Sequence, residues 1–246
     1  MDISKIQPVA NQPALIIDNK ILVIADLHIG IESELSEHGV NVSSQTEKMF
    51  ESLQKICKKY KPERIILLGD VKHNIPTSTF SERKDVRKFL EKTSLLAKID
   101  IVVGNHDGFI KKLTPDNINV HPSDGFIIEN IGFIHGHSWP KEEVILCDQI
   151  IMAHTHPTIM LTDRLEHKSF EPCWIHAKPN KKSIKEKYKI DKIPKILIVP
   201  AFNPLCGGIA INKDGITGPM GKLIAISESS IYLMDGTSLG IVENIK

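Results

Sequence analysis

The sequence predicts an α/β fold, and three observations lead to this prediction. In the first half of the chain, short apolar runs that suit strands alternate with patterns that suit helices, as in a parallel sheet with crossover helices. The second half holds mostly strand-like runs with turn residues between them. The chain contains no internal repeat and no low-complexity tract, so we expect one domain that spans residues 1–246.

The chain begins with a predicted pair of strands. The β-rich runs 14–18 and 21–26 are separated by Asn19 and Lys20, which suit the tight turn of a hairpin. The other elements expected in this half are a helix at 43–60, a strand at 64–70, a helix at 82–92, and a strand with its exit loop at 99–107.

Two features predict the helix over residues 43–60. Ser44 and Glu47 have the spacing of a capping box, in which two side chains bond free backbone N–H groups at the helix start. Apolar residues then recur at helical spacing along one face, and Pro62 ends the helix. The apolar stripe consists of Met49, Leu53, Ile56, Cys57 and Tyr60.

The second half is expected to be rich in strands. Residues 125–137 suit a hairpin that turns near Glu129 and Asn130. A short helical piece is expected after Pro140, and an apolar strand follows it at residues 150–153. Further strands are predicted at 195–202, 208–215, 222–227 and 230–236.

A lysine-rich segment at residues 176–195 is expected to be a loop or an excursion from the domain. Two interpretations stay open: a solvated surface insertion, or a group of cations that grips a polyanion without reading its sequence. Glu186 and Asp191 lie among the lysines and weaken the second interpretation. The whole chain has a formal net charge of +1, so no global field attracts nucleic acid or an anionic membrane.

The cysteines and the apolar runs bear on the cellular compartment. The four cysteines form no C-x-x-C pair, and Cys57 and Cys147 fall in apolar patterns, as buried free thiols do. This pattern fits a reducing cytosol better than a disulfide framework. No apolar run reaches membrane-spanning length and the first residues lack the apolar core of a signal peptide, so we expect a cytoplasmic protein without membrane association.

Five of the predicted strands end in side chains that can bind a metal ion. In open α/β sheets, sites form outside the carboxyl ends of the strands, so these strand ends are expected to meet. The side chains at the five ends are Asp26 and His28; Asp70; Asn105, His106 and Asp107; His135 and His137; and His154 and His156.

The types of side chain indicate which metals would bind. A single histidine beside an apolar run is most often a satisfied core or surface residue, and the pair His154 and His156 does not decide alone. Carboxylate, amide and imidazole groups without thiolate suit a site for Mn²⁺, Fe or Zn²⁺. They do not suit a structural zinc site, which is rich in cysteine. The candidates outnumber the ligands of one ion, which favours two ions about 3.5–4 Å apart bridged by one carboxylate.

The order of these motifs resembles that of the calcineurin-like metallophosphoesterase superfamily. The motifs are D-x-H, G-D, G-N-H-D, a later histidine and finally H-x-H, and they extend from Asp26 to His156. Ala153 stands where the family usually has glycine before the last motif. Together with the strand pattern, the resemblance implies a four-layer α/β/β/α sandwich that hydrolyses phosphoesters with two divalent metal ions.

The resemblance also implies a role for each site residue. It assigns the first metal to Asp26, His28 and His156, the bridge to Asp70, and the second metal to Asn105, His135 and His154. His106 matches the histidine that binds no metal and stabilises the transition state or protonates the leaving oxygen. Asp107 would orient the His106 imidazole, and a metal-bound hydroxide would attack phosphorus.

Three further stretches resemble one branch of this superfamily. Residues 69–73, 135–140 and 200–208 are similar to the ICC-like phosphoesterases, which include relatives encoded beside DNA ligase genes and are related to the Mre11/SbcD nucleases. This resemblance implies Mn²⁺ as the first choice of metal, with Fe, Zn²⁺ or Ni²⁺ as alternatives, and association with DNA repair proteins. His73, His137 and Trp139 are candidate substrate-binding residues, and each also suits an ordinary surface or rim position.

Three functions remain open at this point. The leading hypothesis is a metal-dependent phosphodiesterase that acts on DNA as a nuclease. The first alternative is a phosphoesterase for a small molecule, such as a cyclic nucleotide or a phosphomonoester. The second is a non-catalytic metal-binding scaffold, which the complete set of ligand candidates disfavours.

Overall fold

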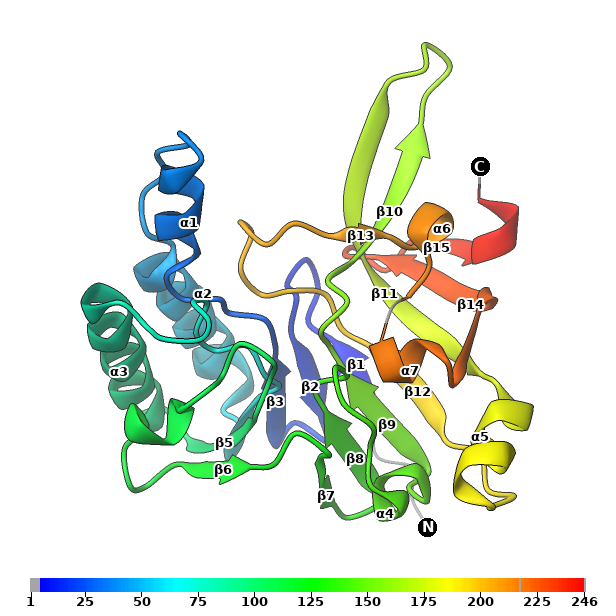
Figure 1. Cartoon of the computed structure of the whole chain (residues 1–246), viewed down its shortest axis with the longest axis horizontal. Helices are drawn as coiled ribbons and strands as arrows, with labels where there is room; N and C mark the ends of the chain where they lie inside the picture. Colours follow the sequence, from blue (N-terminus) through cyan, green and yellow to red (C-terminus); the bar gives the residue numbers. More distant parts are fainter. Residues whose placement is uncertain (1–4, 217, 246) are drawn as a thin grey trace.

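Two β-sheets pack face to face, and helices cover both outer faces (Figure 1). The computed structural model describes residues 5–216 and 218–245. This arrangement is the predicted four-layer α/β/β/α sandwich. None of the helices in the described part of the chain has the length and apolar character needed to span a bilayer.

The first sheet has six strands in the order β1-β2-β3-β4-β5-β6. Its first three strands are antiparallel neighbours, whereas β3 to β6 run parallel. The strands are β1 (Ile6–Pro8), β2 (Leu15–Ile17), β3 (Ile21–Ile24), β4 (Arg64–Leu67), β5 (Lys98–Val102) and β6 (Asn119–His121). The predicted hairpin of β2 and β3 is confirmed, and its turn residues Asp18 and Asn19 have φ of 49° and 56°.

Two long helices cover the outer face of this sheet. They are α2 (Thr46–Tyr60) and α3 (Phe80–Ser94), which follow a short helix α1 (Ile31–Glu37) and precede the 3₁₀ turn η1 (Ile110–Lys112). The predicted stripe of α2 is buried there at Met49, Leu53, Ile56 and Cys57, while Tyr60 is partly buried against the same core. These side chains pack on alternate residues of the strands, such as Leu22, Ile65 and Ile99.

The second sheet is larger and follows the order β13-β10-β11-β12-β9-β8-β7, with β14 paired to β11 and β15 paired to β14. Its first strands are β7 (Phe126–Ile128), β8 (Ile131–Ile134), β9 (Gln149–Met152), β10 (Pro157–Thr162) and β11 (Lys168–Pro179). The others are β12 (Lys195–Ile198), β13 (Ile209–Ala210), β14 (Ile224–Leu233) and β15 (Ser238–Ile241). The predicted hairpin of β7 and β8 is confirmed.

Short helices cover the outer face of the second sheet. They are α4 (Glu142–Ile145), α5 (Lys181–Tyr188), α6 (Ile211–Asp214) and α7 (Gly218–Gly221), and the 3₁₀ turn η2 (Val242–Asn244) follows the last strand. Ile145, Ile184, Ile211 and Met220 bring these helices into one apolar cluster with the outward residues of the sheet.

The two sheets meet in a central core, to which no helix of the described residues contributes a buried side chain. Successive strand residues point to opposite faces, so β4 gives Ile66 to this core and Leu67 to the layer of α2 and α3. On the other side, Phe133 and Trp174 are at most 1% exposed and fill the space between the sheets. This core holds the carboxyl ends of strands from both sheets near one another.

Four features differ from the sequence predictions. Helix α2 begins after Gln45 with no side-chain cap, so Ser44 and Glu47 do not form the predicted capping box; Ser44 accepts the backbone N–H of Thr46, and Glu47 bonds Lys92 of α3. The predicted strand at 208–215 is mostly helix α6, and the two strands predicted within 222–236 form the single strand β14. The long β10–β11 hairpin, which projects from the body in Figure 1, had no counterpart in the prediction.

The lysine-rich segment at 176–195 is also different from the predicted loop or excursion. It forms the end of β11, the whole of α5 and the first residue of β12. Ile184 of α5 is fully buried, and Tyr188 packs against the same apolar cluster while its hydroxyl donates to the carbonyl oxygen of Pro140. The many lysines around these two residues concealed them in the sequence.

Candidate metal centre

The structure brings the predicted strand ends together at one place between the sheets. The possible ligand atoms of Asp26, His28, Asp70 and His156 lie within 4.8 Å of one another. Those of Asp70, His135 and His154 form a second group with the same limit. Asp70 belongs to both groups, which is the geometry that a bridging carboxylate needs.

The backbone at these positions is strained. Asp26, Asp70 and His154 have φ of 55°, 51° and 73°, and both His28 and His156 have φ of 40°. This left-handed conformation costs a non-glycine residue about 1–3 kcal/mol and clusters at functional sites, where the surrounding structure holds it in place. The sheets therefore hold these five side chains in orientations that a relaxed strand exit would not give.

Two glycines allow close packing around Asp70, Gly69 against the second sheet and Gly104 within the first. A Cβ atom on Gly69 would lie 2.2 Å from Nδ1 of His135, and Gly69 has φ of +87°. A Cβ atom on Gly104 would lie 2.2 Å from Oδ1 of Asp70. The G-D and G-N-H-D motifs thus need glycine because side chains of the site occupy the space where any other residue would place its own.

A divalent cation fits the group around Asp70 and His135. The Nδ1 atom of His135 donates to the carbonyl oxygen of Leu68 at 2.8 Å, which leaves Nε2 as the free ring nitrogen. This Nε2 atom lies 3.1 Å from Oδ2 of Asp70, yet has no hydrogen-bond partner among the described residues. A buried ring nitrogen and a buried carboxylate that face each other in this way are suitably placed to share a cation.

The group around Asp26 shows the same arrangement. His156 Nδ1 contacts the Gly207 carbonyl oxygen at 3.0 Å, so its Nε2 atom is free to face the cluster. This Nε2 atom lies 3.3 Å from both His28 Nε2 and Asp26 Oδ1. Both carboxylate oxygens of Asp26 are buried without a hydrogen-bond partner in the described part of the chain. These unsatisfied groups fit a second cation.

The ionisation of the histidines depends on their surroundings. Burial lowers the pKa of His28 to about 3 and that of His154 to about 4, so both rings are neutral near neutral pH, the form that binds metal. Burial alone also disfavours the charged form of His135, but the nearby Asp70 and Asp26 carboxylates outweigh it and raise its pKa to about 9. A cation at this position would therefore replace a proton on His135.

His106 lies beside the first group. Its ring centroid is 4.7 Å from that of His28, and its Nδ1 atom bonds the carbonyl oxygen of His73. Because a carbonyl only accepts, Nδ1 carries the hydrogen and Nε2 is free. Asn105, the preceding residue, is exposed after the end of β5, and its predicted role as a ligand stays a prediction.

The contacts of Asp107 differ from the role that was predicted for it. It was expected to orient the His106 imidazole, but its carboxylate accepts backbone N–H groups of Val71, Lys72 and Gly104 at 2.9, 3.2 and 2.9 Å. Burial, and then the negative charge of Asp70, raises the pKa of Asp107 to about 6. Asp107 thus ties the exit of β4 to the exit of β5, whereas the His73 carbonyl orients His106.

His73 has partners that the sequence did not indicate. Its Nδ1 atom lies 3.1 Å from Nδ1 of His28, and its Nε2 atom hydrogen-bonds the Glu34 carboxylate of α1. Both ring nitrogens of the predicted substrate-binding residue are therefore engaged within the protein. Glu34 was missed because neither α1 nor a motif was visible in the sequence around it.

The other two candidates for substrate binding lie on the far side of the site. The His137 ring is 5.3 Å from that of His135 and 5.9 Å from that of His154. Trp139 is 36% exposed, and Nζ of Lys187 from α5 lies 3.7 Å from its ring centroid. Lys187 was not singled out in the sequence, where it is one of many lysines.

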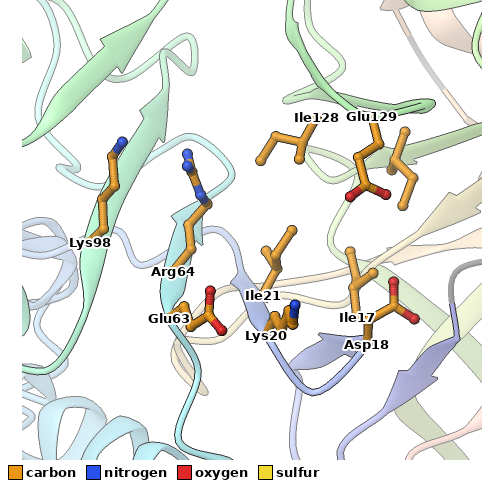
Figure 2. Close-up of a pocket in the computed structure, with 10 residues that line it drawn as sticks. Ile17, Asp18, Lys20, Ile21, Glu63, Arg64, Lys98, Ile128 and Glu129 are labelled. Carbon is orange, nitrogen blue, oxygen red and sulfur yellow. The ribbon is translucent and has the colours of Figure 1, made fainter.

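A separate hollow of about 340 Å³ lies between the sheets but away from this centre (Figure 2). It is lined by Lys20, Arg64 and Lys98, which stand at the amino ends of β3, β4 and β5, together with Glu63 and Glu129. The metal-binding candidates follow the carboxyl ends of the same strands. Since ligand sites of α/β sheets form at carboxyl ends, this hollow is distinct from the candidate centre.

Comparison with known proteins agrees with this geometry. The family model "Calcineurin-like phosphoesterase" matches residues 19–193, which is more than half of the chain. The chain belongs to the calcineurin-like phosphoesterase family. It is accordingly a metal-dependent phosphoesterase, and its clustered aspartates and histidines supply suitable ligands.

Two solved structures are similar to this family member. The nuclease MPE of Pseudomonas putida shares 18% identity with a TM-score of 0.57, over 95% of this chain and 98% of that chain. The E. coli phosphoesterase YfcE shares 14% identity with a TM-score of 0.40, over 89% of this chain and 96% of that chain. The search of curated proteins found no match.

The shared position of Asp70 leads to a first prediction. Asp70→Asn should lose both metal ions or nearly all hydrolytic activity, because a neutral amide bridges two cations poorly. Elemental analysis and turnover of bis-p-nitrophenyl phosphate measure the two effects. Asp163→Asn, in the exposed turn of the β10–β11 hairpin, is the matched control and should change neither. A normal metal content together with normal turnover in Asp70→Asn would refute the bridging role.

Proposed function

We propose that this phosphoesterase cleaves phosphodiester bonds in DNA, with Mn²⁺ as its preferred metal. The observation that carries the diester chemistry is the position of Asp70 in two ligand groups at once. Asp26, His28 and His156 would hold the first ion with Asp70, and His135, His154 and Asn105 would hold the second. When bound, the two ions would activate a water molecule and stabilise the charge of the phosphoryl oxygens.

The protein itself supplies a proton donor for the leaving group. The His73 carbonyl keeps the hydrogen on Nδ1 of His106, so Nε2 is the atom that takes up a proton and passes it to the leaving oxygen. The backbone N–H of His106 donates to Oδ1 of Asp70 at 2.8 Å, which fixes the ring next to the metal groups. General acid assistance of this kind contributes about 10²–10⁴-fold to rate.

A cationic edge supports DNA as the substrate. Lys187 stands over Trp139, which follows His137 by two residues, and the His137 ring lies 5.9 Å from that of His154 in the second ligand group. We infer that the Lys187 ammonium group binds a flanking phosphate of a polymer. The neighbouring Lys185 is paired with Asp191 at 2.6 Å and contributes less free charge. The name of the Pseudomonas putida neighbour, a nuclease, is consistent with this substrate.

Two assays test the proposal. With Mn²⁺ the protein should release nitrophenol from bis-p-nitrophenyl phosphate and should also cleave single-stranded and plasmid DNA. Omission of metal or addition of a chelator should abolish both reactions. Hydrolysis of the small diester without any DNA cleavage would replace the nuclease with a small-molecule phosphoesterase. Failure of both reactions with each of Mn²⁺, Fe²⁺, Zn²⁺ and Ni²⁺ would refute the enzymatic function.

A variant of Lys187 should affect the cleavage of DNA but not the hydrolysis of bis-p-nitrophenyl phosphate. Lys187→Ala should slow DNA cleavage at low enzyme concentration. It should also reduce the slope of log binding affinity against log salt concentration by about 1, which corresponds to one lost phosphate contact. It should leave bis-p-nitrophenyl phosphate turnover unchanged, since that substrate has no flanking phosphate. Lys182→Ala is the matched control, because Lys182 lies on the same helix and pairs with Glu186. Equal effects of the two variants would remove Lys187 from DNA binding.

His106 should matter most for poor leaving groups. His106→Ala should retain both metal ions but cleave DNA about 10²–10⁴-fold more slowly, because the alkoxide leaving group needs a proton. The loss should be much smaller for nitrophenolate, which leaves readily without one. His167→Ala, at the exposed tip of the hairpin, serves as the control. If His106→Ala released a metal ion while Asn105→Ala did not, the roles of these two neighbours would be exchanged.

A further inference from the structure

A loop that follows β12 is fixed tightly against the first ligand group. The backbone N–H of Asn203 donates to the carbonyl oxygen of Asp26 at 3.3 Å, and its side-chain amide donates to that of Leu27 at 2.8 Å. Farther along the loop, the Gly207 carbonyl oxygen contacts His156 Nδ1, and Ile209 N–H donates to the His156 carbonyl oxygen at 3.2 Å. The loop is thus held at both ends by residues of the site.

This loop places the thiol of Cys206 inside the centre. The Sγ atom of Cys206 and ligand atoms of His28 and His156 all lie within 4.8 Å of one another. The same Sγ atom lies 3.6 Å from the carbonyl oxygen of Asp26. The backbone N–H of Cys206 donates to the Asn203 carbonyl oxygen at 3.1 Å, so the position of the thiol follows from the fixed loop.

The ligand group beside the thiol also has unsatisfied acceptors. Asp26 is fully buried, and neither of its carboxylate oxygens has a hydrogen-bond partner among the described residues. One of these oxygens lies 3.3 Å from His156 Nε2, in the same group of atoms. The thiol thus lies beside two imidazoles that also belong to the group of the Asp26 carboxylate, and imidazole and carboxylate groups accompany metal-binding cysteines in proteins.

The other three cysteines have different surroundings. Cys57 is buried in the apolar layer of α2 and α3, and Cys173 is buried on the outer face of the second sheet. The Cys147 thiol, also buried, contacts the carbonyl oxygen of Glu143 at 3.5 Å. None of these three belongs to a ligand group in the described part of the chain.

We propose that Cys206 is a thiolate ligand of the first metal ion and shifts that position toward thiophilic divalent ions such as Zn²⁺. This inference rests on the metal centre of the proposed function and revises the expectation of a site without thiolate. Binding of the cation displaces the thiol proton to solvent, and the sulfur then bonds the ion. Soft sulfur ligands favour Zn²⁺ over Mn²⁺, which prefers oxygen donors.

Cadmium titration of the full chain, stripped of metal with a chelator, tests the proposal. Cd²⁺ bound by thiolate gives an ultraviolet charge-transfer band, which we expect in the wild type and in Cys147→Ser but not in Cys206→Ser or Cys206→Ala. Elemental analysis should still find two ions in each Cys206 variant, held by the remaining ligands. In competition dialysis, the affinity for Zn²⁺ relative to Mn²⁺ should fall at least about tenfold in these variants.

Each outcome bears on one claim. An unchanged charge-transfer band and an unchanged preference between Zn²⁺ and Mn²⁺ in both Cys206 variants would overturn the proposal. The same result would leave the proposed function intact if the wild type cleaves DNA. Conversely, a band that depends on Cys206 in a protein that cleaves no phosphodiester would support the ligand and refute the proposed function. Circular dichroism confirms that each variant is folded before its spectrum is compared.

Discussion

The buried carboxylate of Asp70 is the interaction on which the rest of the site depends. Its Oδ2 atom lies 3.5 Å from Nε2 of His28 in the first sheet and 3.1 Å from Nε2 of His135 in the second. An isolated buried charge costs several kcal/mol, and only well-placed partners offset that cost. The charge of Asp70 is therefore offset from both sheets at once, by the His135 imidazolium of the second sheet and by the backbone N–H of His106 in the first. Any change in how the sheets pack against each other would separate it from one of its imidazoles.

This constraint explains why the local backbone is so irregular. Asp26, Asp70 and His154 leave their strands through left-handed conformations that ordinary strand exits avoid. The strain is opposed by the apolar core between the sheets, where Phe133 and Trp174 are almost wholly buried. Packing energy from this core thus holds the ligands in a geometry that the exits alone would not keep. The site therefore depends on the core, although none of the ligand candidates belongs to this apolar cluster.

The predictable part of the molecule is the part with local periodicity. Short apolar runs that alternate with helical patterns predicted the parallel strands, and the rule that sites form at carboxyl ends placed Asp26, Asp70 and His135 together. Interactions between distant segments were not predictable. The partner of His73 is Glu34, 39 residues earlier, and the partners of Asp107 are backbone N–H groups. The helix α5 was hidden because its single buried residue, Ile184, stands among lysines, so no apolar stripe was visible.

The same reasoning explains why a thiol was left out of the expected ligands. Cys206 is separated from Asp26 by 180 residues, and only the packing of the two sheets brings their atoms to 3.6 Å. If the sulfur binds, the two positions of the centre have different donors. The first would then have sulfur beside two imidazoles and the carboxylates of Asp26 and Asp70, whereas the second would have two imidazoles and only oxygen donors, from Asp70 and the predicted ligand Asn105. Since soft and hard donors select different cations, the centre would favour two unlike metals over a matched pair.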